Sequence, residues 1–89
     1  MGRLDDRIAV VTGAAAGIGL AIAHVFAEEG AHVWLADVEG EKAEAGAAAL
    51  RARGLKATAQ AVDVSRGQDV TALLRAIETA HGRIDALIN

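Results

Sequence analysis

The sequence predicts an α/β protein in which parallel strands form one sheet with helices on both of its faces. Short, nearly continuous apolar runs alternate with longer stretches whose apolar residues recur at helical spacing. The order is strand and helix three times over, followed by a fourth strand. Alternation of this kind is typical of parallel strands joined by right-handed helical crossovers. Because the strands are apolar on both sides, we expect helices on both faces.

The four apolar runs are the expected strands. Residues 7–12 and 32–37 contain the compact runs IAVV and VWLA, which are typical of buried strands. Residues 57–62 form a weaker third strand, with Val62 as the best β-former. Residues 84–89 contain the run ALI and begin a fourth strand.

Three helices are expected between these strands. Residues 17–29 repeat apolar side chains at helical spacing, and residues 39–53 are rich in alanine, glutamate, lysine and arginine, although Gly46 lowers the helix propensity. Residues 65–68, SRGQ, match a capping box at the head of the third helix. The glycines expected to end the three helices are Gly30, Gly54 and Gly82.

Composition excludes several classes of protein. The 89 residues suit one small domain, and 53% hydrophobic content argues against disorder. A net charge of −3 without a basic cluster makes nucleic acid and anionic membranes poor partners, and no apolar run approaches the ~20 residues of a membrane span. The absence of cysteine excludes disulfides and thiolate chemistry and fits the cytoplasm, where we expect the protein. The spacing of His24, His32 and His81 fits no metal site, so we expect these residues at the surface or at helix ends.

A glycine-rich segment, residues 12–19 (TGAAAGIG), lies between the first strand and the first helix. A dinucleotide diphosphate needs backbone N–H donors at a helix N-terminus and room to approach them. Gly13 would permit the tight turn, Gly17 the close approach of the diphosphate, and Gly19 the tight packing of helix on sheet. The residues expected to bind the cofactor here are Gly13, Ala16, Gly17, Ile18 and Gly19.

The spacing of these glycines is G-x3-G-x-G rather than G-x-G-x-x-G, and a turn without a ligand is the alternative. Three features of the context favour dinucleotide binding: the preceding strand, the following helix and an acidic residue that ends the next strand. A P-loop is excluded, because no Gly-Lys-Ser/Thr follows the turn.

The acidic residue is Asp37, which lies 18 positions after Gly19. A carboxylate at this place accepts hydrogen bonds from the adenosine ribose and repels a 2′-phosphate. Neither Ala16 nor Val38 is basic, so we predict NAD rather than NADP. Alternatively Asp37 caps the following helix, and the two roles can coexist.

Three motifs together resemble the short-chain dehydrogenase/reductase family. Residues 12–19 look like its TGxxxGxG signature, and Asp63-Val64 after the third strand resembles its Asp-Val pair. Residues 87–89, LIN, resemble the approach to its Asn-Asn-Ala-Gly motif, of which only Asn89 is present. The resemblance extends over the whole chain. It implies that Asp63 and Val64 hold the adenine ring and that Asn89 belongs to the cofactor site.

The resemblance also implies a Rossmann-type sheet with strand order 3-2-1-4, with the first two helices on one face and the third on the other. Residues 1–89 would be the N-terminal dinucleotide-binding part of a single domain of about 250 residues, ending at the fourth strand. The implied activity is hydride transfer between NAD and an alcohol or ketone, usually by a homo-oligomer.

Catalysis in the family depends on a serine and a Tyr-x-x-x-Lys pair. This chain has no tyrosine, its single serine, Ser65, lies at an expected helix cap, and Lys42 and Lys56 lack a tyrosine partner. We therefore predict no catalytic residue here and no activity for the chain by itself. A non-catalytic NAD-binding module and a truncated product without function remain alternatives.

Overall fold

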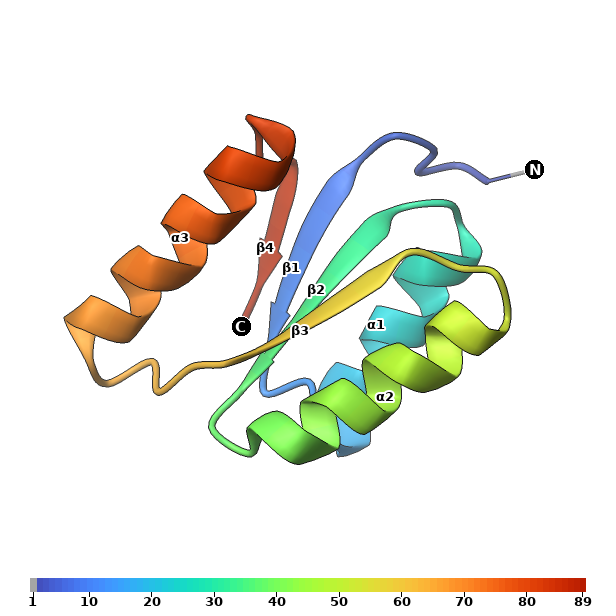
Figure 1. Ribbon diagram of the computed structural model, residues 1–89. Coiled ribbons are helices and arrows are strands. Elements are labelled where there is room, and N and C mark those ends of the chain that lie inside the picture. The colour runs from blue at the N-terminus through green and yellow to red at the C-terminus, as the bar shows by residue number, and fades with distance from the viewer. Residues whose placement is uncertain (1) are drawn as a thin grey trace.

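The computed structural model describes residues 2–89 and contains the seven predicted elements (Figure 1). They follow one another as β1 (Ile8–Thr12), α1 (Gly17–Glu28), β2 (His32–Asp37), α2 (Gly40–Ala52), β3 (Ala57–Ala61), α3 (Gly67–His81) and β4 (Ala86–Ile88). Their ends lie within two residues of the predicted ends.

The four strands form one parallel sheet in the order β3-β2-β1-β4, which confirms the predicted topology. In the register, Thr12 of β1 pairs with Ala36 of β2, and Val11 pairs with Ile88 of β4. Because all strands run in the same direction, their carboxyl ends meet at one edge of the sheet. That edge carries the glycine-rich loop.

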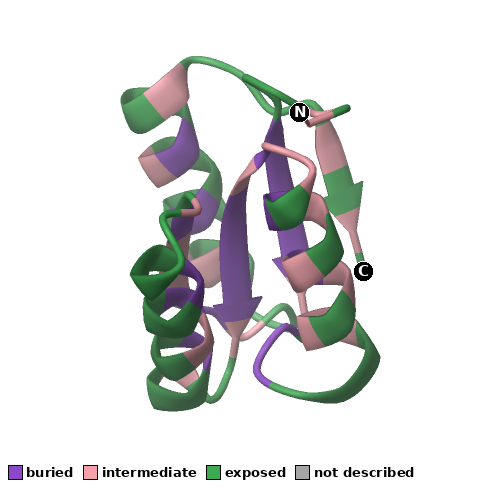
Figure 2. Cartoon of the chain, turned by 90° about the vertical axis from the view of Figure 1, so that its right-hand side faces the viewer, coloured by how far each residue is buried: buried purple, intermediate pink, exposed green. Residues whose placement is uncertain are grey.

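The helices divide between the two faces as predicted, with α1 and α2 on one face and α3 on the other (Figure 1). Side chains alternate along the strands: Val33 and Leu35 of β2 pack toward α1 and α2, and Trp34 packs toward α3. Figure 2 shows the buried strands between these layers. The side chains that α1 and α2 bury against the sheet are mostly alanines, namely Ala23, Ala27, Ala43 and Ala47.

Gly46 has a packing role in α2. A Cβ atom at this position would lie 3.0 Å from Cδ1 of Leu20 in α1 and 3.3 Å from Cδ2 of Leu35 in β2. Glycine therefore lets α2 approach both neighbours, and this contact compensates for its low helix propensity.

The predicted helix ends are confirmed, because Gly30, Gly54 and Gly82 have φ of 99°, 79° and 75°, the left-handed conformation typical of helix ends. The predicted capping box is wrong. Arg66 is the N-cap of α3, without a side-chain cap. The hydroxyl of Ser65 instead donates to Oδ1 of Asp63 at 2.6 Å, since this carboxylate is a nearby, charged acceptor.

Candidate functional site

A cleft of about 370 Å³ lies at the carboxyl edge of the sheet. It is lined by Thr12, Gly13, Ala36, Asp37, Val38, Val62, Asp63, Val64 and Asn89. The predicted site residues among these are Gly13, Asp37, Val38, Asp63, Val64 and Asn89. They come from the ends of four strands, which the parallel topology brings together. The other predicted site residues, Ala16, Gly17, Ile18 and Gly19, lie in the adjoining loop and first turn of α1 and do not line the cleft.

The conformation of the loop requires two of its glycines. Gly13 and Gly17 have φ of 64° and 61°, which side-chain-bearing residues rarely adopt. A Cβ atom on either residue would meet nothing within 4 Å, so the space beside their Cα atoms is open. The backbone at Gly17 can therefore be approached closely.

Gly19 is close-packed, but its neighbour is the glycine-rich loop rather than the sheet that the sequence predicted. A Cβ atom here would overlap the carbonyl oxygen of Gly13 and lie 2.8 Å from its carbonyl carbon. The predicted contact of helix with sheet is in fact a contact of helix with the start of its own loop. Gly13 directly follows Thr12, the last residue of β1, so the contact lies where the sheet passes into the loop.

The N-terminus of α1 carries no anion of its own. Its N-cap is Ala16, which makes no side-chain cap, and the first turn contains no acidic residue. The first amides of a helix have no partners within the helix and carry a partial positive charge. Ala16, Gly17 and Ile18 are exposed, so this end of the helix can receive an anionic group.

Asp37 uses both carboxylate oxygens. Oδ2 accepts a hydrogen bond from the amide of Ala15 at 3.0 Å, and Oδ1 accepts one from the amide of Glu39 at 2.9 Å. The interpretation of Asp37 as a helix cap is wrong, because the N-cap of α2 is Glu39 and no side chain caps this helix. Asp37 instead holds the turn before α2 and the glycine-rich loop of α1.

Asp63 faces the same cleft as an ionised carboxylate. The hydroxyl and the backbone amide of Ser65 donate hydrogen bonds that lower the pKa of Asp63 below its usual value. Apolar side chains stand beside this charge, since Val38 is 69% exposed and Val64 is 63% exposed. A planar apolar group with polar edges, such as a nucleobase, would contact both kinds of surface.

Thr12 is a cleft residue that the sequence interpretation missed. Its hydroxyl lies 3.1 Å from Oδ1 of Asn89 and 3.2 Å from the carbonyl oxygen of Ile88, so it can donate to either acceptor on β4. Its position as the first residue of the glycine-rich segment could have identified it as a cleft residue. A hydroxyl at a strand end has no role in the strand ladder and is available for a neighbour.

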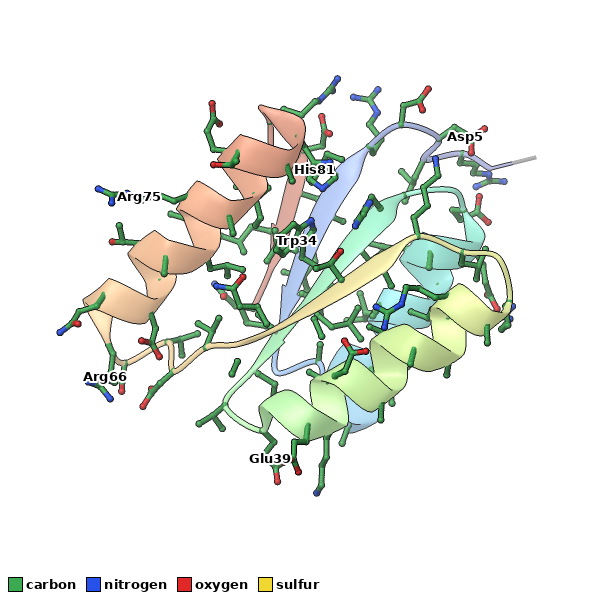
Figure 3. All side chains as sticks on the ribbon, in the orientation of Figure 1. Asp5, Trp34, Glu39, Arg66, Arg75 and His81 are labelled. Carbon is green, nitrogen blue, oxygen red and sulfur yellow. The ribbon has the colours of Figure 1, made fainter. Side chains whose placement is uncertain are left out.

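A second polar cluster, between the sheet and α3, was also missed. Trp34 Nε1 donates to Nε2 of His81 at 2.9 Å (Figure 3). The His81 ring centre is 4.5 Å from that of His32. His32 also bonds Oγ1 of Thr58 at 2.8 Å. Burial, His81 and Lys56 lower the pKa of His32. Within residues 2–89, no group of three potential metal ligands is present and no helix is long and apolar enough to cross a bilayer.

The sheet order and the cleft at the strand ends define a Rossmann-type α/β protein. The sequence model of the short chain dehydrogenase family matches residues 7–89, and the chain belongs to this family. The family and the fold together indicate a nicotinamide dinucleotide cofactor.

Relatives and solved structures agree with this assignment. The uncharacterized oxidoreductase YxbG of Bacillus subtilis (strain 168) is 45% identical over 89 residues, which are 100% of this chain and 33% of that protein. Galactitol 2-dehydrogenase of Agrobacterium fabrum is 41% identical over 98% of this chain and 33% of its own length. The solved structure of the citronellol catabolism dehydrogenase AtuB of Pseudomonas aeruginosa PAO1 superposes with a TM-score of 0.95 at 34% identity, over 99% of this chain and 37% of that chain. The chain thus spans about a third of the length of the curated relatives it matches.

Proposed function

We propose that this chain binds NAD(H) along the carboxyl edge of its sheet, as the cofactor-binding part of an oxidoreductase that acts on an alcohol or ketone. The observation that carries the proposal is the single cleft in which residues from four strand ends meet, beside a helix N-terminus that has no anion of its own. The name of the relative galactitol 2-dehydrogenase supports the reaction class. Because the chain has no tyrosine, we assign cofactor binding to it and no catalytic step.

The described residues fit a dinucleotide. The open space at Gly13 and Gly17, which a Cβ atom would partly fill, gives a diphosphate access to the amides at the start of α1. Asp37 supplies acceptors for ribose hydroxyls, and Val38, Asp63 and Val64 supply an apolar and polar border for adenine. Asn89 stands at the β4 side of the cleft, where Thr12 holds its side chain. When bound, the nicotinamide would accept or donate the hydride.

NAD is the proposed form of the cofactor. The residues that line the cleft include two carboxylates, Asp37 and Asp63, and no lysine or arginine. The 2′-phosphate of NADP would therefore meet like charge without a basic partner. Two unit charges about 4 Å apart near a protein surface repel by roughly 1–4 kcal/mol. We expect NAD to bind at least about tenfold more tightly than NADP.

Calorimetric titration of the folded chain with NAD and with NADP tests the proposal. The Gly17→Val variant should lose NAD binding, because valine strains a left-handed residue and fills the approach to the α1 amides. Gly54→Val is the matched control: Gly54 is also left-handed and also has open space around it, but it follows α2 and lies outside the glycine-rich loop. Equal binding by both variants, or no binding by the folded wild-type chain, would contradict the proposal.

A further inference from the structure

Asp37 has a second role in the structure, because its carboxylate joins two parts of the site. Oδ2 accepts from the Ala15 amide in the glycine-rich loop while Oδ1 accepts from the Glu39 amide beyond β2. We infer that Asp37 is a positioning residue for diphosphate binding, in addition to its proposed role as acceptor for the ribose. Removing it should weaken the binding of a diphosphate that has no ribose. This inference rests on the proposed function of the cleft.

The Ala15 contact fixes the base of the loop. Ala14 and Ala15 are buried, and the next residue, Ala16, is exposed. Two hydrogen bonds join this buried base to the end of β2. One runs from the Ala14 amide to the carbonyl oxygen of Ala36 at a long 3.3 Å, and the other is the Asp37 contact at 3.0 Å. Hydrogen bonds to a charged acceptor are the stronger kind, so Asp37 holds the loop more firmly than the backbone contact does.

Without the carboxylate, the Ala15 amide would be a partly buried donor without its acceptor. Such a group opens toward water or shifts to another partner. The exposed residues Gly17 and Ile18, which begin α1, follow two and three positions later, so a shift at Ala15 would move their amides as well. Binding would then require the loop to be ordered again, which lowers affinity.

Charge alone predicts the opposite effect. A carboxylate near the loop repels an anion, so its removal without any change in the loop should tighten diphosphate binding. Asp63 provides the comparison, because it lines the same cleft with the same charge, but its carboxylate accepts hydrogen bonds from Ser65 rather than from the loop. Asp37→Ala and Asp63→Ala remove the same atoms and the same charge. Only Asp37→Ala removes the contact to Ala15.

The experiment uses the 89-residue chain and its two alanine variants, with inorganic diphosphate as the probe in amide chemical-shift titrations. Hydrogen exchange of the Ala15 amide is measured without ligand. For Asp37→Ala we expect about tenfold faster exchange at Ala15 and severalfold weaker diphosphate binding. For Asp63→Ala we expect unchanged exchange at Ala15 and equal or tighter binding. Asp37→Asn, which keeps one acceptor oxygen, should lie between wild type and Asp37→Ala.

Two results would overturn the inference. One is exchange at Ala15 that is as slow in Asp37→Ala as in wild type. The other is diphosphate binding by Asp37→Ala that is at least as tight as that by Asp63→Ala. If the folded wild-type chain binds neither diphosphate nor NAD, the proposed function fails, and the exchange rates still decide whether Asp37 holds the loop.

Discussion

The close packing at Gly19 leads to a prediction in which two known effects oppose each other. Gly19 is the third residue of α1, and alanine has a helix propensity better than that of glycine by up to about 1 kcal/mol. Propensity alone thus predicts that Gly19→Ala stabilises the protein. The added Cβ atom, however, would overlap the carbonyl oxygen of Gly13 and lie 2.8 Å from its carbonyl carbon and 3.3 Å from the Cα atom of Ala14.

These neighbours are backbone atoms, which cannot rotate away as a side chain could. The loop or the helix must therefore move, and we take the upper end of the usual cost of overpacking, about 3 kcal/mol. After the gain in propensity, Gly19→Ala should lower the free energy of unfolding by about 2 kcal/mol. With a urea m-value of about 1–1.5 kcal/mol/M for a small domain, the unfolding midpoint should fall by roughly 1.5 M.

Urea unfolding followed by circular dichroism measures this midpoint. The matched control is Gly67→Ala, at the first residue of α3, where a Cβ atom meets nothing within 4 Å and φ is not positive. That variant should be as stable as wild type or slightly more stable. If Gly19→Ala unfolds at the wild-type midpoint or above it while Gly67→Ala behaves as expected, α1 does not pack on its loop as described.

Three further predictions concern stability. Leu50→Ala should cost about 2–5 kcal/mol in urea unfolding, because Leu50 is fully buried, while Leu74→Ala, at a position 41% exposed, should cost far less. The pKa of His32 is lowered in the folded chain, so as pH falls the unfolded chain takes up a proton near pH 6.5 before the folded chain does. The urea unfolding midpoint should therefore fall as pH drops below about 6.5. A His32→Gln variant whose midpoint falls just as steeply from pH 7.5 to 5 would disprove this. Hydrogen bonds from Arg83 and from the Ile8 amide lower the pKa of Asp85. These contacts therefore stabilise the fold above about pH 4, and their contribution is lost as pH falls through the lowered pKa. Asp85→Asn should therefore reduce the loss of stability below pH 4 and leave the slope between pH 5 and 7.5 unchanged.

Most of the fold could be predicted because each signal was local. A run such as VWLA at residues 33–36 indicates a buried strand wherever it packs, and left-handed glycines end helices through the conformation of a single residue. The gathering of Gly13, Asp37 and Asp63 in one cleft could also be predicted, since parallel strands place their carboxyl ends together.

The failures occurred where a longer-range or competing contact decided the outcome. Ser65 matches a capping pattern, but the N-cap of α3 is Arg66, and the hydroxyl of Ser65 donates to the carboxylate of Asp63. The Trp34–His81 contact joins residues 47 positions apart, and it depends on which face of β2 carries Trp34 and on how α3 is rotated. Neither quantity follows from the sequence alone. The contact of Asp37 with Ala15 was hidden in the same way, because a loop conformation selects which amide points at the strand end.

The position of β1 in the sheet explains which parts of the cleft are coupled. The cleft residues recur at regular intervals, with Asp37 following Gly13 by 24 positions and Asn89 following Asp63 by 26, since each strand and helix unit returns the chain to the same edge. Because β1 lies between β2 and β4, the chain at its end reaches both neighbours: Ala15 bonds Asp37 on one side, and Thr12 bonds Asn89 on the other. Asp63, which follows β3, lies one strand further away, and its carboxylate accepts hydrogen bonds from Ser65 instead. Substitutions at Asp37 and Asn89 should therefore disturb the glycine-rich loop, and substitutions at Asp63 should change only the far wall of the cleft.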